Sequence, residues 1–263
     1  MHAEAFLIDL DGVMYVGGTV IPGAREAIRF LEEQGYPFRF VSNTTRKSRH
    51  TIAGQLETMG FSIPESHIFT PAAAAAAYLV QNHRKSALLL TTEEVAGEIM
   101  ASAGIVQNQD TAESVIVGDA GDRFTYGELN TAFRWLLEGA ELIALEKDRY
   151  WMGTDGMMLS AGPFVAGLEY ATGKEALVMG KPSPAFFHQA LASMGAEPAT
   201  AVMVGDDVVT DVGGAISCGL SGILVRTGKF REEALAHAPH RPSAILDTIA
   251  DLPAYLESRL RKG

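Results

Sequence analysis

Short apolar runs alternate with longer amphipathic stretches along most of the chain, and this rhythm predicts the elements of the fold. The runs are apolar at every position, as is typical of strands that helices cover on both faces. Strands and helices alternating in this way predict a parallel sheet with helices on its two sides. In the outer parts of the chain we expect strands at 5–8, 37–41, 176–179, 201–204 and 221–225, and helices at 23–34, 48–59, 184–194 and 211–218.

The middle of the chain repeats the alternation, but its predicted strand ends carry few reactive side chains. We expect strands there at 86–90, 114–117 and 141–145, and helices at 93–102 and 126–137. We interpret this part as a second α/β domain that is inserted into the first. The predicted bounds are 1–83 and 174–263 for a discontinuous, Rossmann-like, doubly wound core with a parallel sheet, and 84–173 for the insert.

Composition and charge narrow the functions that the chain could have. Its 263 residues are 47% hydrophobic and 20% charged, which indicates a folded protein of one or two domains rather than a disordered one. The net charge of −11 argues against a nucleic-acid or anionic-membrane partner, because phosphate groups would repel such a surface. Small anionic substrates remain compatible with this charge if their positive partners are local.

Features that would direct the chain to another compartment are missing from the sequence. The single cysteine, Cys218, has no partner for an internal disulfide, which favours a reducing compartment. No apolar run approaches the length of a membrane span, and the N-terminal residues lack the basic region of a signal peptide. We therefore expect a cytoplasmic protein without a membrane partner.

Polar side chains follow the predicted core strands at the point where each strand ends. Asp9 and Asp11 follow the first strand, and Ser42 follows the second. Lys181 and Asp206 follow the two strands that come directly after the insert. Ligands of open parallel sheets bind beyond the carboxyl ends of the strands. We therefore expect these five side chains to gather at one edge of the sheet and to form the functional site.

The carboxylates of this set predict a metal site. Asp9 and Asp11 are two residues apart in an extended segment, so their side chains project the same way. Carboxylates this close raise each other's pKa unless a cation lies between them. Oxygen ligands of this kind, with Asp206 nearby, suit Mg²⁺, which takes a few carboxylates together with waters and a substrate phosphate. Taken alone, the Asp-x-Asp-Gly sequence would equally fit an ordinary turn.

The remaining polar groups at the strand ends suit a phosphate. Lys181 supplies a positive charge and Ser42 a hydroxyl group, and the loops around Gly12 and Asn43 offer backbone N–H groups. Lysines are mostly solvated surface residues, but Lys181 follows a buried run and precedes Pro182, which restricts its loop. We therefore predict that these groups bind the phosphoryl oxygens of a small phosphorylated substrate.

The order of these motifs resembles a known enzyme family. Asp9-x-Asp11-Gly12, Ser42-Asn43, Lys181 and the segment 205–211 match, in order, the four motifs of haloacid dehalogenase superfamily phosphatases. The long insert resembles the C2 cap of subfamily IIA, the NagD-like group. The segment 205–229 is most similar to the branch that holds phospholysine phosphohistidine inorganic pyrophosphate phosphatases. The resemblance covers nearly the whole chain and implies a core with an α/β C2-type cap.

The resemblance assigns a role to each residue of the motifs. Asp9 is implied as the nucleophile that forms an aspartyl-phosphate, and Asp11 as the acid and base that serves the leaving group and the attacking water. Mg²⁺ is implied to bind Asp9, the backbone carbonyl of Asp11, and Asp206. Ser42 and Lys181 are implied to hold the transferring phosphoryl group. The resemblance also allows a homodimer formed through the cap.

Two further acids and one cap loop are candidates for supporting roles. Asp211 is expected to orient the waters of the metal, or Lys181, rather than to bind the metal directly. For Asp207 a solvated or helix-capping role is as consistent with the sequence as a place next to the metal ligands. In the cap segment 147–156, Arg149, Tyr150 and Asp155 are candidates for contacting the leaving group, although a surface hairpin with a Thr-Asp-Gly turn explains the same residues.

These observations predict a Mg²⁺-dependent phosphatase that hydrolyses a small phosphorylated metabolite. Dehalogenation is disfavoured, because Asp11 supplies the acid that an oxygen leaving group needs. One alternative is hydrolysis of P–N or P–O–P bonds, in phosphohistidine, phospholysine or pyrophosphate, which only the resemblance of the segment 205–229 suggests. A second alternative is a non-catalytic module that senses a phosphorylated metabolite and keeps the metal site without turnover.

Overall fold

A computed structural model describes residues 4–107, 112–153 and 156–260, and its chain falls into two compact units. The first unit comprises residues 1–42, 52–69 and 181–263, and the second comprises residues 43–51 and 70–180. The second unit is larger than the insert predicted at 84–173, since it also takes in 43–51, 70–83 and 174–180.

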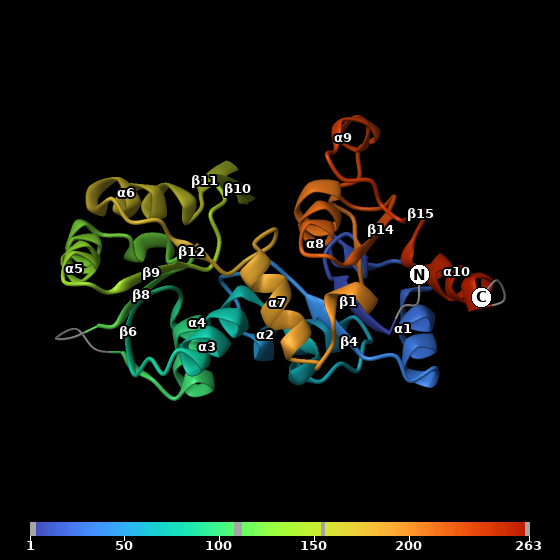
Figure 1. Ribbon diagram of the computed structural model, residues 1–263, viewed down its shortest axis with the longest axis horizontal. Helices are drawn as coiled ribbons and strands as arrows, with labels where there is room; N and C mark the ends of the chain where they lie inside the picture. The colour runs from blue at the N-terminus through green and yellow to red at the C-terminus, as the bar shows by residue number, and fades with distance from the viewer. Residues whose placement is uncertain (1–3, 108–111, 154–155, 261–263) are drawn as a thin grey trace. The chain divides into compact units, whose positions relative to one another are not determined.

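The first unit is built on a six-stranded sheet with the strand order β15-β14-β13-β1-β4-β5. Figure 1 labels β1, β4, β14 and β15 of this sheet. All neighbouring strands in it are parallel, in agreement with the predicted fold class. The strands are β1 (Ala5–Asp9), β4 (Phe38–Val41), β5 (Ile68–Phe69), β13 (Ala201–Gly205), β14 (Ser221–Val225) and β15 (Ala244–Leu246). A short hairpin, β2 (Tyr15–Val16) and β3 (Thr19–Val20), follows β1.

Helices cover both faces of this sheet, which explains why its central strands are apolar at every position. On one face, Phe6 and Ile8 of β1 share a buried cluster with side chains of α1, α2 and α10. On the other face, Leu224 of β14 packs against the segment that follows β13. The helices are α1 (Ala24–Glu33), α2 (Arg49–Thr58), α7 (Pro184–Ala192), α8 (Gly214–Ser217), α9 (Glu232–His237) and α10 (Leu252–Leu260), and a π-helical turn (Val208–Gly213) precedes α8.

The second unit has its own parallel sheet, with the strand order β12-β9-β8-β6-β7, and a separate hairpin. Helices α5 and α6 pack on one face of the sheet, and α3 and α4 lie on the other (Figure 1). The strands are β6 (Ser86–Leu90), β7 (Val106–Gln107), β8 (Ser114–Val117), β9 (Glu141–Ala144) and β12 (Leu177–Val178), with β10 (Tyr150–Gly153) and β11 (Gly156–Leu159) in the hairpin. The helices are α3 (Pro71–Gln81), α4 (Glu93–Ala103), α5 (Tyr126–Leu137) and α6 (Gly162–Thr172).

One predicted strand belongs to the other sheet. We assigned the apolar run at 176–179 to the core sheet, but β12 pairs with β9 of the second unit, with Leu177 opposite Ile143. Val178 packs against the apolar cluster that α5 and α6 form with that sheet, which explains why the strand lies there. Among the helices that the structure describes, none combines the length and the hydrophobicity that are needed to cross a membrane.

Candidate active site

The carboxyl ends of three neighbouring strands bring the predicted site residues of the first unit together. Asp9 is the last residue of β1, and it lies opposite Val41, so that Ser42 follows directly beside it. On the other side of β1, Ile8 lies opposite Val204, and the strand β13 ends just before Asp206. The parallel register therefore places the ends of β4, β1 and β13 at one sheet edge, as predicted.

A buried cluster of three acids and one lysine occupies this edge. Asp9, Asp206 and Asp211 each offer a carboxylate oxygen, and these oxygens all lie within 4.8 Å of one another. The Nζ atom of Lys181 lies 2.5 Å from Oδ1 of Asp9 and 2.7 Å from Oδ1 of Asp211. The side chain of Lys181 is only 4% exposed, so both ion pairs are shielded from water. These contacts place Lys181 beside Asp9 and Asp211, although the preceding strand β12 belongs to the other sheet.

The ionisation of the cluster is governed by burial and by the excess of negative charge. Burial, together with a smaller effect of the charge of Asp211, raises the pKa of Asp9 to about 7 in spite of the opposing effect of Lys181. Burial also raises the pKa of Asp206 to about 6, against the backbone N–H of Lys229. For Lys181, burial alone would lower the pKa, but Asp211 and Asp9 together raise it above its ordinary value. Lys181 is therefore charged at neutral pH, and the acids around it favour a further cation.

The residues present fit a magnesium ion. Mg²⁺ prefers hard oxygen ligands and commonly binds one or two carboxylates together with water and phosphate oxygens. Asp9 and Asp206 supply such oxygens, and both residues are buried, which is the main reason that the pKa values of both are raised. No cysteine or histidine belongs to this cluster in the part of the chain that the structure describes. The donor set thus matches a hard divalent cation rather than a soft one.

Asp11 and Gly12 form the turn that follows β1. The side chain of Asp11 is exposed, in contrast to that of Asp9, and Asp11 is not part of the acid cluster. The N–H of Gly12 donates a hydrogen bond of 2.7 Å to the carbonyl oxygen of Tyr15. Burial and the charges of Asp11 and Asp9 raise the pKa of Tyr15 to about 12, so its hydroxyl group stays protonated. An exposed carboxyl two residues from the buried one is free to exchange protons with water and ligands.

The structure separates the functions of the two acids that follow Asp206. Asp211 pairs with Lys181 and also accepts a hydrogen bond of 3.2 Å from the N–H of Asp207. The carboxylate of Asp207 instead accepts hydrogen bonds from the N–H groups of Val209 and Thr210, which caps the π-helical turn. Of the two roles that the sequence left open for Asp207, the structure shows the capping role.

The two predicted residues after β4 lie in different units. The N–H of Ser42 donates a hydrogen bond of 3.1 Å to the carbonyl oxygen of Phe69, which fixes the backbone beside the end of β1. Asn43 belongs to the second unit, where its Oδ1 atom lies beside Gly180; a Cβ atom on that glycine would lie 3.2 Å from it. Gly180 directly precedes Lys181 in the chain.

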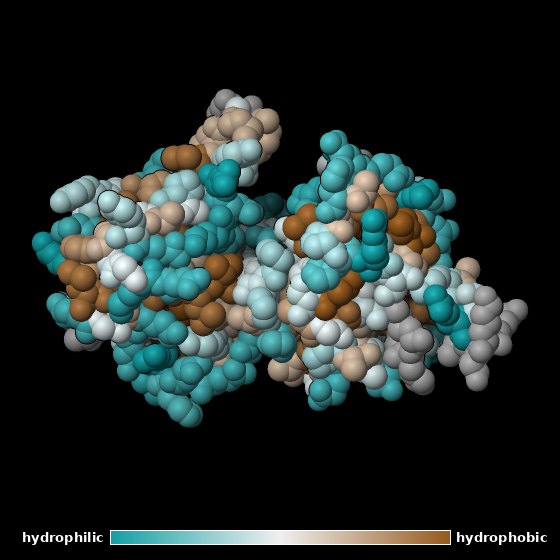
Figure 2. Space-filling model, turned by 45° about the horizontal axis from the view of Figure 1, so that its top comes forward, coloured by the Kyte–Doolittle hydropathy of each residue, from teal (hydrophilic) through white to brown (hydrophobic). Residues whose placement is uncertain are grey.

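The cap loop predicted at 147–156 forms the hairpin of β10 and β11. Arg149 and Tyr150 are both exposed, and Asp155 lies outside the described residues. Most apolar side chains of the hairpin are exposed as well, and Figure 2 shows it as a projection with largely hydrophobic colouring. The exposed side chains include Met152 at 70% and Leu159 at 63%. The surface-hairpin alternative thus describes the conformation, whereas a contact with a leaving group stays a prediction.

Contacts within the second unit hold this hairpin at its base and on its face. The buried carboxylate of Glu146 accepts hydrogen bonds from the hydroxyl group of Ser160, at 2.6 Å, and from the N–H of Ala161, at 2.9 Å. The guanidinium group of Arg46 lies over the ring of Trp151, 5.5 Å from its centre, and also pairs with the buried Asp119 at 3.1 Å. Sequence reasoning did not find these anchors, because their partners are more than ten residues away.

A turn after β14 is a part of the site that the sequence analysis also missed. The N–H of Lys229 donates a hydrogen bond of 2.6 Å to Oδ2 of Asp206, and the hydroxyl group of Thr227 donates to the carbonyl oxygen of Gly12. The sequence could have indicated this turn, since Thr-Gly-Lys follows a predicted strand, as the other site residues do.

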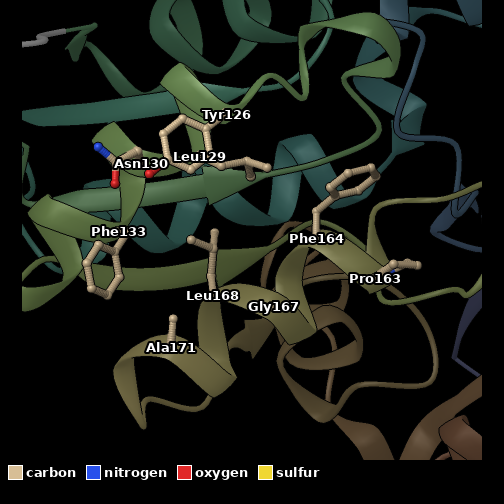
Figure 3. A pocket seen from close by; sticks show the side chains of 9 residues that line it. All are labelled: Tyr126, Leu129, Asn130, Phe133, Pro163, Phe164, Gly167, Leu168 and Ala171. Atoms are coloured by element: carbon tan, nitrogen blue, oxygen red, sulfur yellow. The ribbon is translucent and has the colours of Figure 1, made fainter.

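A pocket in the second unit has a different character. It lies between α5 and α6 and has a volume of about 280 Å³ (Figure 3). The side chains that line it are mostly apolar and include no carboxylate, lysine or arginine; they are Tyr126, Leu129, Asn130, Phe133, Pro163, Phe164, Gly167, Leu168 and Ala171. Such a lining does not suit a phosphate group, which leaves the acid cluster of the first unit as the candidate active site.

Comparisons with known proteins agree with the motifs. A family model described as haloacid dehalogenase-like hydrolase matches residues 6–106, and a model described as HAD-hydrolase-like matches residues 178–252. The human phospholysine phosphohistidine inorganic pyrophosphate phosphatase is 41% identical over 253 residues, which cover 93% of this chain and 91% of that protein. The resemblance predicted from the motifs is thereby confirmed.

Solved structures with the same fold include the following two. NagD from Escherichia coli K-12 aligns with a TM-score of 0.87 and 27% identity, over 95% of this chain and 98% of that one. The p-nitrophenyl phosphatase from Archaeoglobus fulgidus aligns with a TM-score of 0.88 and 26% identity, over 97% of this chain and all of the other. The coverage in both directions confirms a core with a cap, as the sequence predicted.

Proposed function

Because the chain belongs to the haloacid dehalogenase-like hydrolase family, we propose that it is a Mg²⁺-dependent phosphatase that acts on a small phosphorylated metabolite through an aspartyl-phosphate intermediate. The observation that carries this proposal is the buried cluster in which Lys181 lies between Asp9 and Asp211, with Asp206 alongside. A buried cation between acids at the end of a central strand suits binding and transfer of a phosphoryl group.

In the first step, a carboxylate oxygen of Asp9 attacks phosphorus while the bond from phosphorus to the leaving oxygen breaks. Asp11 donates its proton to that leaving oxygen, and the product alcohol departs. In the second step, Asp11 takes a proton from a water molecule as the water attacks phosphorus, which releases inorganic phosphate and regenerates Asp9. The contrast between a buried Asp9 and an exposed Asp11 supports this division of roles, because proton exchange requires access to solvent.

The positive and polar groups of the site hold the phosphoryl oxygens. Lys181 is charged, because the nearby carboxylates raise its pKa, and it is fixed in place by two ion pairs. Ser42 follows the strand next to β1 and contributes a hydroxyl group, and the loops around Gly12 and Asn43 contribute backbone N–H groups. Asp211 positions Lys181 through their 2.7 Å ion pair. These groups orient the substrate for attack by Asp9.

Asp9, Asp206 and the backbone carbonyl of Asp11 would hold Mg²⁺. When bound, Mg²⁺ shields the negative charge of the carboxylate from that of the phosphoryl group and so reduces their repulsion. Asp206 is well suited to this role, because it is 1% exposed and its orientation is fixed by the N–H of Lys229.

Arg149, Tyr150 and Asp155 of the cap hairpin are proposed to contact the leaving group. The exposure of Arg149 and Tyr150 supports this proposal, since a contacting side chain must be accessible. Exchanging the segment 147–156 for that of a relative should change the preference among metabolite substrates, with turnover of 4-nitrophenyl phosphate roughly retained. An unchanged preference across the panel would contradict a role of this hairpin in specificity.

A second candidate function is hydrolysis of P–N or P–O–P bonds. It is favoured by the 41% identity to a protein named as a phospholysine, phosphohistidine and inorganic pyrophosphate phosphatase. The same cluster would serve, with a nitrogen or phosphate leaving group in place of an alcohol. Parallel assays with phosphohistidine, phospholysine, pyrophosphate, sugar phosphates, phosphoglycolate, pyridoxal phosphate and nucleotides distinguish the two functions by the highest kcat/KM.

The decisive experiment measures phosphate release from 4-nitrophenyl phosphate with Mg²⁺ and with EDTA. We expect Mg²⁺-dependent turnover that Asp9→Asn abolishes and Asp11→Asn reduces nearly as much. Asp247→Asn removes an acid that is 84% exposed and should leave turnover unchanged, which controls for charge. Wild-type protein that is inactive on every substrate but binds phosphate and Mg²⁺ would instead support the non-catalytic sensing module.

A further inference from the structure

The turn after β14 contacts the acid cluster at Asp206. This turn, Thr227–Lys229, begins two residues after β14 ends and is itself largely exposed. Its Lys229 N–H donates a hydrogen bond of 2.6 Å to Oδ2 of Asp206, while the hydroxyl group of Thr227 donates to the carbonyl oxygen of Gly12. The turn is therefore bonded both to the carboxylate and to the loop that follows β1.

Two glycines enclose the same carboxylate oxygen from both sides. A Cβ atom on Gly228 would lie 2.0 Å from Oδ2 of Asp206 and 2.5 Å from the Cα atom of Gly12. A Cβ atom on Gly12 would lie 1.9 Å from the same oxygen. Real Cβ atoms keep at least 3.0 Å from such neighbours, so a side chain at either position would displace the carboxylate by about 1 Å. Oδ2 thus lies in a slot that only glycines leave open.

The position of the Asp206 carboxylate needs this support, because the neighbouring carboxylates of the cluster repel it. Asp206 is 1% exposed, and its carboxylate shares the site with those of Asp9 and Asp211. Like charges at this distance repel one another in a buried site. A hydrogen bond from a backbone N–H favours the ionised carboxylate and sets its direction without adding a mobile side chain. The slot and the N–H together hold Asp206 facing the other acids.

We infer that Gly228 and the N–H of Lys229 form a positioning element for metal binding, which orients Asp206 toward the ion. This inference rests on the proposed function, because it assumes that the cluster binds Mg²⁺. Groups that orient a metal ligand commonly change metal affinity by about 10–100-fold when they are altered. The expected consequence of filling the slot is therefore a loss of Mg²⁺ affinity of roughly that size.

The test compares Gly228→Ala with Gly195→Ala. Both glycines belong to the first unit and have positive φ, +57° and +64°, but a Cβ atom on Gly195 meets nothing within 4 Å. The two substitutions thus add similar strain from positive φ, and only the first places a Cβ atom against the Asp206 carboxylate and the Cα atom of Gly12. Isothermal titration calorimetry with Mg²⁺ measures the Kd, and the rise of Tm on adding Mg²⁺ gives a second readout that does not depend on activity.

We expect Gly228→Ala to raise the Kd for Mg²⁺ by about 10–100-fold and Gly195→Ala to leave it within about twofold of wild type. Equal Mg²⁺ affinity of the two variants would overturn the inference. If Gly228→Ala does not fold, Thr227→Val removes one hydroxyl hydrogen bond of the same turn and should raise the Kd by a smaller factor; a wild-type Kd in that variant also overturns it. A wild-type protein without Mg²⁺ affinity refutes the metal role in the proposed function, which separates the two failures.

Discussion

Replacing Lys181 by methionine tests whether the buried ion pairs organise the site. Met has nearly the length of Lys but no charge, so Lys181→Met leaves Asp9, Asp206 and Asp211 in one buried cluster without their cation. At an effective dielectric constant of about 20, unit charges at the observed 2.5 and 2.7 Å attract each other by roughly 6–7 kcal/mol per pair. Most of this attraction offsets the cost of burying the charges.

The net loss of stability depends on the buried carboxylates that lose their cation. Breaking a buried pair by removing one partner costs about 3–5 kcal/mol, because the remaining charge is buried without compensation. For a protein of this size, this corresponds to a decrease in Tm of roughly 6–20 °C, at about 2–4 °C per kcal/mol. The loss should be greatest near pH 8 and smaller near pH 5.5, where Asp9, with a pKa of about 7, is protonated and no longer needs a cation.

Thermal unfolding in EDTA at the two pH values measures these differences. The matched control is Arg29→Met, which breaks an ion pair of 4.0 Å on α1 in which both side chains are 66% exposed. Such exposed pairs contribute about 0–1 kcal/mol, so the control should change Tm little at either pH. If Lys181→Met loses no more stability than Arg29→Met near pH 8, the ion pairs of Lys181 do not organise the cluster.

Two further predictions concern titration and the cap hairpin. In EDTA, the stability of the wild-type protein should fall as pH rises from about 4 toward 7, because Asp9 has a folded pKa of about 7 against an ordinary value of 3.8, and its protonated form favours the folded state. Saturating Mg²⁺ should flatten this profile of Tm against pH, and a profile in EDTA that rises across the window would contradict it. Glu146→Ala should lower stability by about 1–3 kcal/mol, because it leaves the Ser160 hydroxyl group and the Ala161 N–H buried without an acceptor. Hydrogen exchange should then show faster exchange at Ala161, whereas unchanged protection there would mean that Glu146 does not hold the hairpin.

Much of the site could be predicted because its residues directly follow apolar strands. Asp9, Ser42 and Asp206 lie where the predicted strand ends place them, since side chains at the ends of parallel strands share one edge. For Lys181, the strand on which the prediction rested belongs to the other sheet. Its preceding strand, β12, pairs with β9 of the other sheet, and Lys181 reaches Asp9 through the loop after that strand. Apolar periodicity identifies a strand but does not identify the sheet that it joins.

The residues that anchor the hairpin could not be predicted from the strand pattern, for a different reason. Glu146 follows a buried strand much as Asp9 does, so the sequence pattern alone would make both acids candidate site residues. What distinguishes them is the set of partners. Glu146 accepts hydrogen bonds from a hydroxyl group and from backbone N–H groups, whereas Asp9 faces a lysine and two other acids. A carboxylate satisfied by neutral donors has a structural role, and one held among like charges is prepared for a cation or a phosphate.

The order of the strands explains why the turn at Gly228 matters to the site. In the first sheet β13 lies between β14 and β1, so the residue that follows β13 is flanked by the loops that follow its two neighbours. Asp206 is that residue, and Gly12 and Gly228 are the residues of the two flanking loops that meet its carboxylate. A carboxylate in the middle of three parallel strands can face the sheet edge only if both neighbouring loops leave it space. The two glycines are far apart in the sequence, and the strand order that makes them neighbours is set by packing of the whole sheet, which no local pattern contains.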